Sequence, residues 1–266
     1  LHVGQRELAH LVAAQVKDYR GDATAAVAET FDATPANLDA RTQLSRVGGL
    51  QVALLPKGTR GQAVQARLRL HYGDVDSLKG QQTVAALAAS LVEKGGAGMS
   101  RQQVADAFDR LQANVSFSGS GQTLNVAITT KRDRLPAVVE LVGKLLRDPA
   151  YAADPLEEAR RQSLTGIESQ RKEPEAVIAN VLARHGNPYA RGDLRHARSF
   201  DEMAQDVKAV TTEQLKAFHR RFLSAAQGEF AAVGDLDPAA VTKALQTVFA
   251  DWRQPAGGAL AYQRMP

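Results

Sequence analysis

Residues 83–96, TVAALAASLVEKGG, predict the helix around which the rest of the fold is built. Val84, Leu87 and Leu91 recur at the spacing of a helix that buries one face. The alanines between them favour helix and keep it thin, so that another backbone can approach closely. A lysine followed by two glycines at 94–96 is a typical helix end.

One face of this predicted helix carries no reactive group. Ala86, Ala89 and Ser90 lie at i, i+3 and i+4 and therefore share a face. Two methyl groups and a hydroxyl supply neither a general base nor a strong metal ligand. A serine nucleophile also needs a base, and none lies near Ser90 in the sequence. The stretch therefore predicts a packing helix without chemistry of its own.

Composition places the chain among soluble globular proteins. Its 266 residues can form one large domain, or one domain with an arm, and they are 44% hydrophobic and 23% charged. The absence of cysteine excludes a disulfide framework and a thiol nucleophile. It fits the cytoplasm or a disulfide-free periplasmic protein.

The charge pattern points away from nucleic acid and membranes. The net charge of +4 comes from 33 basic and 29 acidic residues spread evenly along the chain. No Lys/Arg block with interleaved aromatic residues appears, so nucleic-acid binding is not predicted. No apolar run approaches the length of a membrane span.

The first 40 residues differ from the rest. Residues 8–19 predict an amphipathic helix. Residues 21–40 are rich in Ala, Asp, Thr and Pro with little periodicity, which indicates an extended arm. We therefore expect an N-terminal helix and linker at 1–40, a globular body at 41–254 and a tail at 255–266.

Strands are predicted where apolar and polar residues alternate. Residues 42–47 and 50–55 flank two glycines, which indicates a hairpin. Residues 63–72 alternate as well, and their two faces carry Leu68, Leu70 and Tyr72 on one side and Arg67, Arg69 and His71 on the other. Further strands are predicted at residues 114–118, 123–130 and 227–233.

Helices are predicted from apolar spacing and from capping residues. Ser100 with a glutamine three residues later forms a capping box. Asp133 is predicted to cap the next long helix, and Asp154 with Pro155 to begin the one after it. The predicted helices span residues 83–93, 100–111, 133–146, 155–171, 174–184, 211–222 and 237–249. Short hairpins and paired helices predict an α+β fold, a largely antiparallel sheet with helices packed on one face.

Residues 47–96 also resemble the opening of a lobe of the pitrilysin/insulinase zinc peptidases, the inverzincins, which include mitochondrial processing peptidase-like proteins. A hairpin with a Gly-Leu turn, a strand, a loop and a helix follow in that family's order. Later segments continue it: LRDPAY, KEPEAV, HGNPYARG, VTTEQLKAFHRRFL and AAVGDLDPAAV. The resemblance covers roughly residues 42–254.

The departures from the family concern its zinc site. Aligned by its Lys-Gly end, the helix places Ala86, Ala89 and Ser90 where the family carries the His, Glu and His of H-x-x-E-H. The third ligand, a glutamate on a later helix, falls at about Gly166. These residues cannot hold zinc or move a proton. The resemblance thus implies no catalytic, metal-binding or cofactor-binding residue in this chain.

The resemblance also implies a context. Such peptidases have two homologous halves of two lobes each around a chamber, and the second half commonly lacks the metal. The chain resembles the first lobe of a second half, with a tail that leads to a further lobe. We expect a non-catalytic domain that lines the chamber and supports a zinc-bearing H-x-x-E-H half, in the same chain or a partner subunit. Peptide substrates and, as for many bacterial members, the periplasm are expected. The alternative is a degenerate scaffold that acts only in protein assembly.

Other polar residues receive structural interpretations. His185 and His196 bracket a segment whose Asn-Pro and Arg-Gly pairs predict turns, in preference to a metal loop. His71 and His219 are expected to be solvated or hydrogen-bonded, and Trp252 to be a packing anchor.

The alignment makes one geometric prediction. If the fold is the peptidase lobe, the helix at 83–93 lies against the helix at 155–171, because the family's zinc is held between those two helices. Gly166 then faces Ala86, Ala89 and Ser90 with α-carbons within about 10 Å. The space should be closed by apolar side chains or hold only water.

Overall fold

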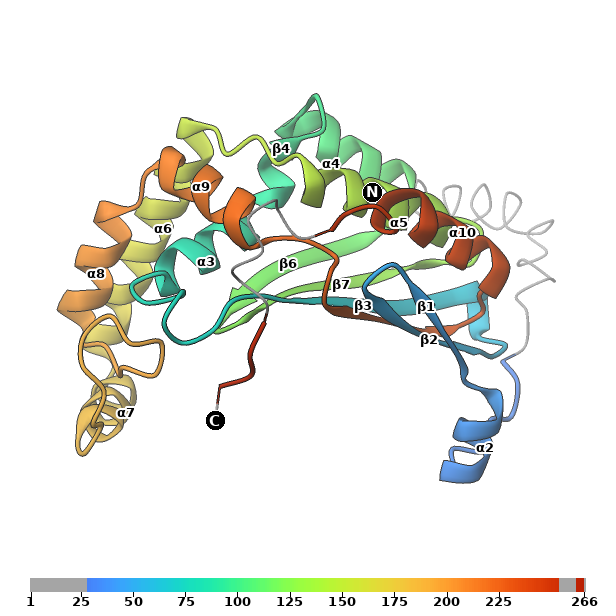
Figure 1. Ribbon diagram of the computed structural model, residues 1–266, viewed down its shortest axis with the longest axis horizontal. Helices are drawn as coiled ribbons and strands as arrows, with labels where there is room; N and C mark the ends of the chain where they lie inside the picture. Colours follow the sequence, from blue (N-terminus) through green and yellow to red (C-terminus); the bar gives the residue numbers. More distant parts are fainter. Residues whose placement is uncertain (1–27, 254–261, 266) are drawn as a thin grey trace, which may run out of the picture.

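The computed structural model describes residues 28–253 and 262–265, and it has the predicted α+β fold (Figure 1). A six-stranded sheet has the order β1-β2-β8-β3-β7-β6, and β4 and β5 form a small second sheet. Only β2 and β8 pair in parallel, whereas the other neighbours in the large sheet are antiparallel. The strands are β1 (Gln43–Val47), β2 (Leu50–Pro56), β3 (Ala63–His71), β4 (Gly95–Gly96), β5 (Met99–Ser100), β6 (Asn114–Ser120), β7 (Thr123–Lys131) and β8 (Gly228–Gly234).

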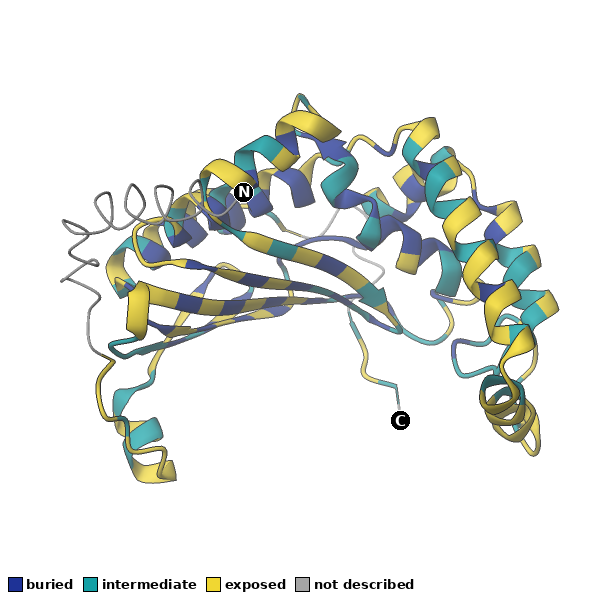
Figure 2. Ribbon diagram, turned by 180° about the vertical axis from the view of Figure 1, so that it is seen from behind, coloured by how far each residue is buried: buried dark blue, intermediate teal, exposed yellow. Residues whose placement is uncertain are grey.

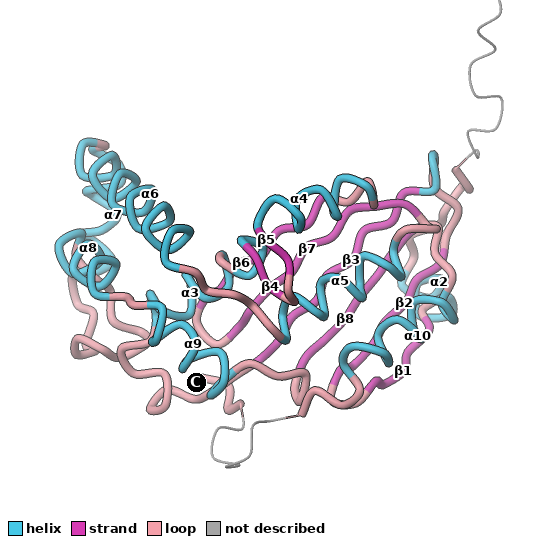
Figure 3. The backbone as a smooth tube through the Cα atoms, turned by 90° about the horizontal axis from the view of Figure 1, so that it is seen from above, coloured by secondary structure: helices cyan, strands magenta, loops and turns pink. Residues whose placement is uncertain are grey.

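Helices cover one face of the large sheet and leave the other uncovered (Figures 1 and 2). Helices α5 and α10 pack against each other on the covered side, while α6, α7 and α8 project beyond one end of the sheet (Figure 3). The helices are α2 (Pro35–Arg41), α3 (Gln82–Ser90), α4 (Arg101–Arg110), α5 (Leu135–Arg147), α6 (Ala153–Lys172), α7 (Pro174–Arg184), α8 (Phe200–Ala209), α9 (Thr212–Phe222) and α10 (Pro238–Phe249). None of these described helices is long and apolar enough to cross a membrane.

The strands alternate between the core and the uncovered face, as their sequences predict. In β3 the side chains of Leu68 and Leu70 are buried, whereas Arg67 and Arg69 are exposed. The strands β2 and β8 follow the same rule, so one continuous core lies between the sheet and the helices. An antiparallel sheet can keep one face in water in this way.

Several predicted boundaries are confirmed and others are corrected. The hairpin of β1 and β2 and the capping box at the start of α4 form as predicted, and α9 lies within the predicted span 211–222, with a capping box at Thr211. Helix α3 is shorter than predicted, because it ends at Ser90 and a short 3-10 turn, Val92–Lys94, follows. Asp133 does not cap α5: the N-cap is Arg134, without a side-chain hydrogen bond.

Two further corrections concern helix starts. Helix α6 begins at Ala153, so Asp154 lies in its first turn. A carboxylate there still stabilises the helix, because its negative charge interacts favourably with the positive end of the helix dipole. Within the predicted extended arm, residues 35–41 form helix α2 with a proline in its first turn, a position that proline favours. The predicted helix at 8–19 lies outside the described residues.

Helix α8 was not predicted. Its start carries a capping box, in which the Ser199 hydroxyl accepts from the Glu202 amide and the Glu202 side chain accepts from the Ser199 amide. The same serine-to-glutamate signal could have located it.

The C-terminal segment 262–265 docks onto the turn between β6 and β7. The Gln122 amide donates to the carbonyl oxygens of Gly73 and Gln263 at 2.9 and 2.6 Å, and its oxygen accepts from the Met265 amide at 2.9 Å. Tyr262 stacks on His71 with ring centres 4.7 Å apart. Gln122 is only 7% exposed, so one buried side chain holds three backbone groups in place.

Candidate functional site

The three residues of helix α3 that align with the His, Glu and His of the family's H-x-x-E-H differ in exposure. Ala86 is exposed, Ser90 is half-buried and Ala89 is 1% exposed. The Ser90 hydroxyl donates to the Leu87 carbonyl within the same helix at 3.2 Å. None of these side chains can supply a zinc ligand of the usual kind or a general base.

The position of the family's catalytic glutamate is closed by strand β6. A Cβ atom built on Gly119 would lie 2.9 Å from the Ala89 Cβ and 2.6 Å from the Ala85 carbonyl oxygen. The helix and the strand are therefore in direct contact at Ala89. A larger side chain there could not fit without displacing packed neighbours.

Gly166 does not meet α3 in the predicted way. It is exposed on α6, and no atom of the described residues lies within 4 Å of a Cβ built on it, neighbours and its own helix backbone aside. Helix α3 packs on β6 and α9, and α6 packs on α7 and α8. The prediction that apolar side chains close the space at Gly166 is therefore wrong, whereas the predicted α-carbon separation of about 10 Å stays a prediction. The unpredicted α8 packs along α6 and also touches α3.

These four positions do not fit a zinc ion, because they offer no imidazole nitrogen and no carboxylate. Within residues 28–253 and 262–265, no group of three or more His, Asp or Glu side chains is placed to hold a metal. We derive no metal-dependent step for this chain.

The uncovered face of the large sheet carries exposed residues in alternation with buried ones (Figure 2). Most of their side chains are small, polar or cationic, and Leu44 is exposed at the edge strand. Paired residues in adjacent strands share a face, so the strand register defines each row. Across the sheet from β1 to β6, one row reads Leu44, Ala53, Ala231, Arg67, Ala127 and Ser116. The neighbouring row reads Arg46, Gln51, Glu229, Arg69, Asn125 and Ser118.

This face is hollowed in three adjoining places. A hollow of about 370 Å³ lies over β3, β7 and β8, and Arg67, Arg69, Ser116 and Glu229 are among the residues that line it. A second hollow, of about 640 Å³, continues from Arg69 and Glu229 to the docked tail. A third, of about 280 Å³, is mostly apolar and lies at the other end, over β2 and β8.

The single carboxylate in these two rows is already engaged. Glu229 lies 3.9 Å from Arg69 and 3.4 Å from the His71 Nε2, and Arg69 also donates to Asn125 at 3.1 Å. Ion pairs as exposed as Arg69–Glu229 contribute little stability, about 0–1 kcal/mol. The face is therefore solvated and polar, with cations in excess.

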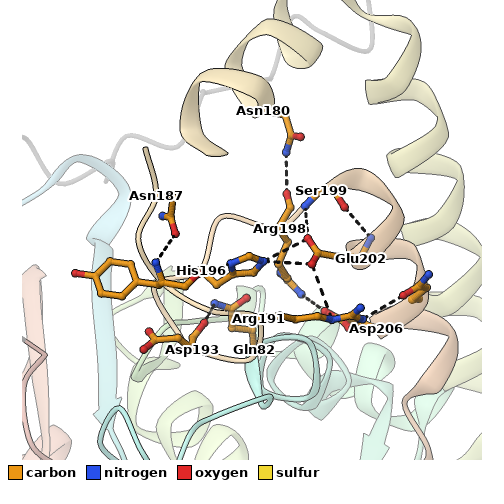
Figure 4. Close-up of polar contacts among 12 residues, drawn as sticks. Gln82, Asn180, Asn187, Arg191, Asp193, His196, Arg198, Ser199, Glu202 and Asp206 are labelled. Carbon is orange, nitrogen blue, oxygen red and sulfur yellow. Dashed lines mark hydrogen bonds and ion pairs between the residues drawn. The ribbon is translucent and has the colours of Figure 1, made fainter. Parts of the chain in front are cut away.

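A second polar cluster joins the 185–199 loop to α8 and the start of α3 (Figure 4). The ring of His196 lies between the Tyr189 carbonyl oxygen, 2.8 Å from Nδ1, and Glu202, 3.3 Å from Nε2. Arg198 donates to Thr83 of α3 at 2.6 Å and to Asp206 of α8 at 3.0 Å.

Hydrogen bonds within this cluster stabilise the charged forms of its carboxylates Glu202 and Asp193. Hydrogen bonds from the Ser199 amide and His196 lower the pKa of Glu202. Hydrogen bonds from Arg195 lower the pKa of Asp193 to about 2. The predicted turn at Arg191-Gly192 forms, whereas the first turn lies at residues 185–186 and not at the Asn-Pro pair that follows it. Both ring nitrogens of His196 face protein oxygens. The cluster therefore fastens the loop to the helices.

Two further interpretations are confirmed. The His219 Nε2 lies 2.7 Å from the Leu146 carbonyl oxygen. Trp252 packs against the core, and its ring lies roughly parallel to those of Phe249 and His219, with ring centres 6.2 and 6.4 Å away.

Comparisons with known proteins agree with this architecture. Residues 209–266 match the family model described as the peptidase M16 inactive domain. No curated protein matches the chain. The fold is similar to the peptidase M16 inactive domain from Pseudomonas fluorescens, with a TM-score of 0.68 and 22% identity over 83% of this chain and 53% of that one.

Two other solved structures share the fold. A protease from Helicobacter pylori has a TM-score of 0.69 at 16% identity, over 82% of this chain and 52% of that one. The periplasmic protease PqqL from Escherichia coli has a TM-score of 0.68 at 16% identity, over 90% of this chain and 26% of that one. The chain thus spans about half the length of the first two. These findings confirm the fold class and the resemblance to pitrilysin/insulinase-type peptidases, and in particular to their inactive domains.

Proposed function

We propose that the chain is a non-catalytic domain of a zinc metallopeptidase of the pitrilysin/insulinase type. In this role it lines the proteolytic chamber and supports an active half that carries H-x-x-E-H, in the same chain or in a partner subunit. The observation that carries the proposal is that the positions aligned with the zinc ligands hold none: Ala89 is buried against β6, and Gly166 is exposed on α6. The match of residues 209–266 to an inactive-domain model supports it.

The uncovered face of the sheet supports a lining role. A wall that faces peptides in water should be polar and not close-packed, which describes the face centred on Arg67 and Arg69. A periplasmic location is proposed as well, supported by the likeness to the periplasmic protease PqqL.

A scaffold without any role in proteolysis is the second candidate. It is favoured by helix α7, which has no buried residue and exposes Ile178, Val181 and Leu182 by 58%, 55% and 66%. Such clustered apolar exposure is typical of surfaces that contact another protein.

One experiment separates these candidates. The chain would be purified alone and together with an H-x-x-E-H half encoded in the same or a neighbouring reading frame. Zinc would be measured after dialysis, and a quenched peptide library would report cleavage. We expect no stoichiometric zinc and no turnover by the chain alone, and chelator-sensitive turnover that rises when the chain joins the active half.

Two outcomes would contradict the proposal. Chelator-sensitive cleavage by the isolated chain would show that it is not a non-catalytic domain. An active half whose turnover and stability do not change on omission of the chain would favour the scaffold.

A further inference from the structure

We propose that the uncovered face of the sheet binds an acidic, extended polypeptide segment, with Arg67 at the centre of the contact. The inference rests on the proposed function, because it names the kind of peptide that a chamber-lining face would hold.

Cations outnumber carboxylates on this face. The strand residues that point to it include four cationic side chains and one carboxylate, namely Arg46, Arg67, Arg69, Lys131 and Glu229. Arg69 and His71 share Glu229. In the described part of the chain, no carboxylate lies within 4.0 Å of Arg46, Arg67 or Lys131.

Arg67 is exposed near the middle of the sheet, on β3 between β8 and β7. Its partners in the strand register are Ala127 on β7 and Ala231 on β8, and Ala53 lies one strand further along the row. Ala127 and Ala231 help line the hollow of about 370 Å³ beside Arg67, and Ala53 lines the neighbouring apolar hollow. A guanidinium group standing over such a floor can bind a carboxylate with two parallel hydrogen bonds.

Charge decides which partner this face can accept. An apolar partner would remove Arg67 and Arg46 from water without a counter-ion, and uncompensated burial of a charge costs several kcal/mol. A partner with carboxylates supplies the missing counter-ions. A single-stranded nucleic acid would also be anionic, but it is bound mainly by aromatic stacking, and the described strand residues of this face include no Phe, Tyr or Trp. The ring of Tyr262, in the docked tail beside this face, is already stacked on His71.

The spacing of the rows suits an extended chain. Same-face residues along a strand, such as Arg67 and Arg69, repeat about every 6.8 Å, and so do alternate side chains of an extended peptide. Carboxylates at alternate positions can therefore meet both rows. Beyond them, the apolar hollow over Leu55 and Val233 can take an apolar side chain.

The test uses the whole chain and three fluorescein-labelled peptides of twelve residues. They alternate serine with glutamate, glutamine or lysine, and fluorescence polarisation measures their binding at low and at high salt. We expect the glutamate peptide to bind at least about tenfold more tightly than the other two, and its affinity to fall as salt screens the charges.

Matched variants locate the contact. Arg67→Glu reverses one charge on the uncovered face of the sheet. Arg110→Glu makes the same change at an exposed position of α4, on the helix-covered side of the sheet. Arg67→Glu should weaken binding of the glutamate peptide by about tenfold and Arg110→Glu by less than about twofold. Thermal melting of both variants would verify that they remain folded.

Each contrary result overturns the inference. One is equal binding of the three peptides, another is an equal loss in both variants, and a third is tighter, Arg67-dependent binding of an oligothymidine. No peptidase enters this assay, so the two proposals can fail separately. Acidic-peptide binding without any effect on an active half would remove only the proposed function. Support of an active half without acidic-peptide binding would remove only the present inference.

Discussion

Gly119 and Gly166 are glycines in regular elements with opposite surroundings. At Gly119 a methyl group would collide with the Ala85 carbonyl and with Ala89, because β6 and α3 touch there. At Gly166, in the exposed middle of α6, a methyl group would meet nothing within 4 Å. The first glycine allows a close contact between two elements, whereas the second only weakens its helix.

We therefore predict opposite effects of the same substitution. Gly119→Ala should lower the free energy of unfolding by about 1–3 kcal/mol, because two packed backbones must separate. Gly166→Ala should raise it by about 0.5–1 kcal/mol, because alanine favours helix and restricts the unfolded chain. Urea unfolding of both variants provides the measurement. A clear loss of stability in Gly166→Ala would mean that this position is packed after all.

His219 makes stability depend on pH. Burial lowers its pKa below the ordinary value, and this effect outweighs the hydrogen bond to Leu146 and the charge of Asp148, which act in the opposite direction. The folded state therefore keeps the ring neutral where the unfolded chain, with a pKa of about 6.5, already binds a proton. Stability from this group is complete above about pH 6.5 and is lost as the pH falls toward the lower pKa of the folded state.

The corresponding prediction compares two proteins at two pH values. Between pH 7.5 and pH 5.5 the parent chain should lose more stability than His219→Gln, which keeps an N–H donor for Leu146 but does not titrate. Melting temperatures at both pH values would be measured. Equal losses in the two proteins would show that His219 is not the group responsible.

At the scale of elements, Gln122 connects the β6–β7 turn to the C-terminal segment. Replacement by leucine would leave the carbonyl oxygens of Gly73 and Gln263 and the Met265 amide without this partner. We predict a loss of about 1–3 kcal/mol in stability and faster hydrogen exchange at Met265. Gln246→Leu, on the exposed side of α10, is the control and should change neither quantity. Unchanged protection of Met265 in Gln122→Leu would mean that other contacts hold the segment.

At the scale of the whole molecule, the apolar surface to examine is on α7. We predict that the double variant Ile178→Lys/Leu182→Lys will bind less of a hydrophobic dye. Its melting temperature should hardly change, because α7 buries no residue and surface substitutions usually alter stability by less than about 0.5 kcal/mol. Dye fluorescence and thermal melting would be compared with Glu175→Lys on the same helix. A large loss of stability would show that this face is packed within the chain.

The sequence by itself determined most elements, because their signals are local. Alternation within β3 predicted which side chains face the core and which face away. The capping box at Ser100 predicted the start of α4, and the start of α9 was predicted at Thr211. The absence of zinc ligands could also be inferred from Ala86, Ala89 and Ser90, since side-chain chemistry does not depend on packing.

The tertiary structure alone decided how these elements meet. Strand β8 comes late in the chain and pairs between β2 and β3, which places Ala231 beside Arg67 and Glu229 beside Arg69 on the uncovered face. Helix α8 packs along α6, and Gly166 lies on an exposed part of α6. Local propensity describes neighbours along the chain, whereas these contacts depend on strand pairing and packing between segments far apart in sequence. For this reason the elements could be predicted from the sequence and the candidate binding face could not.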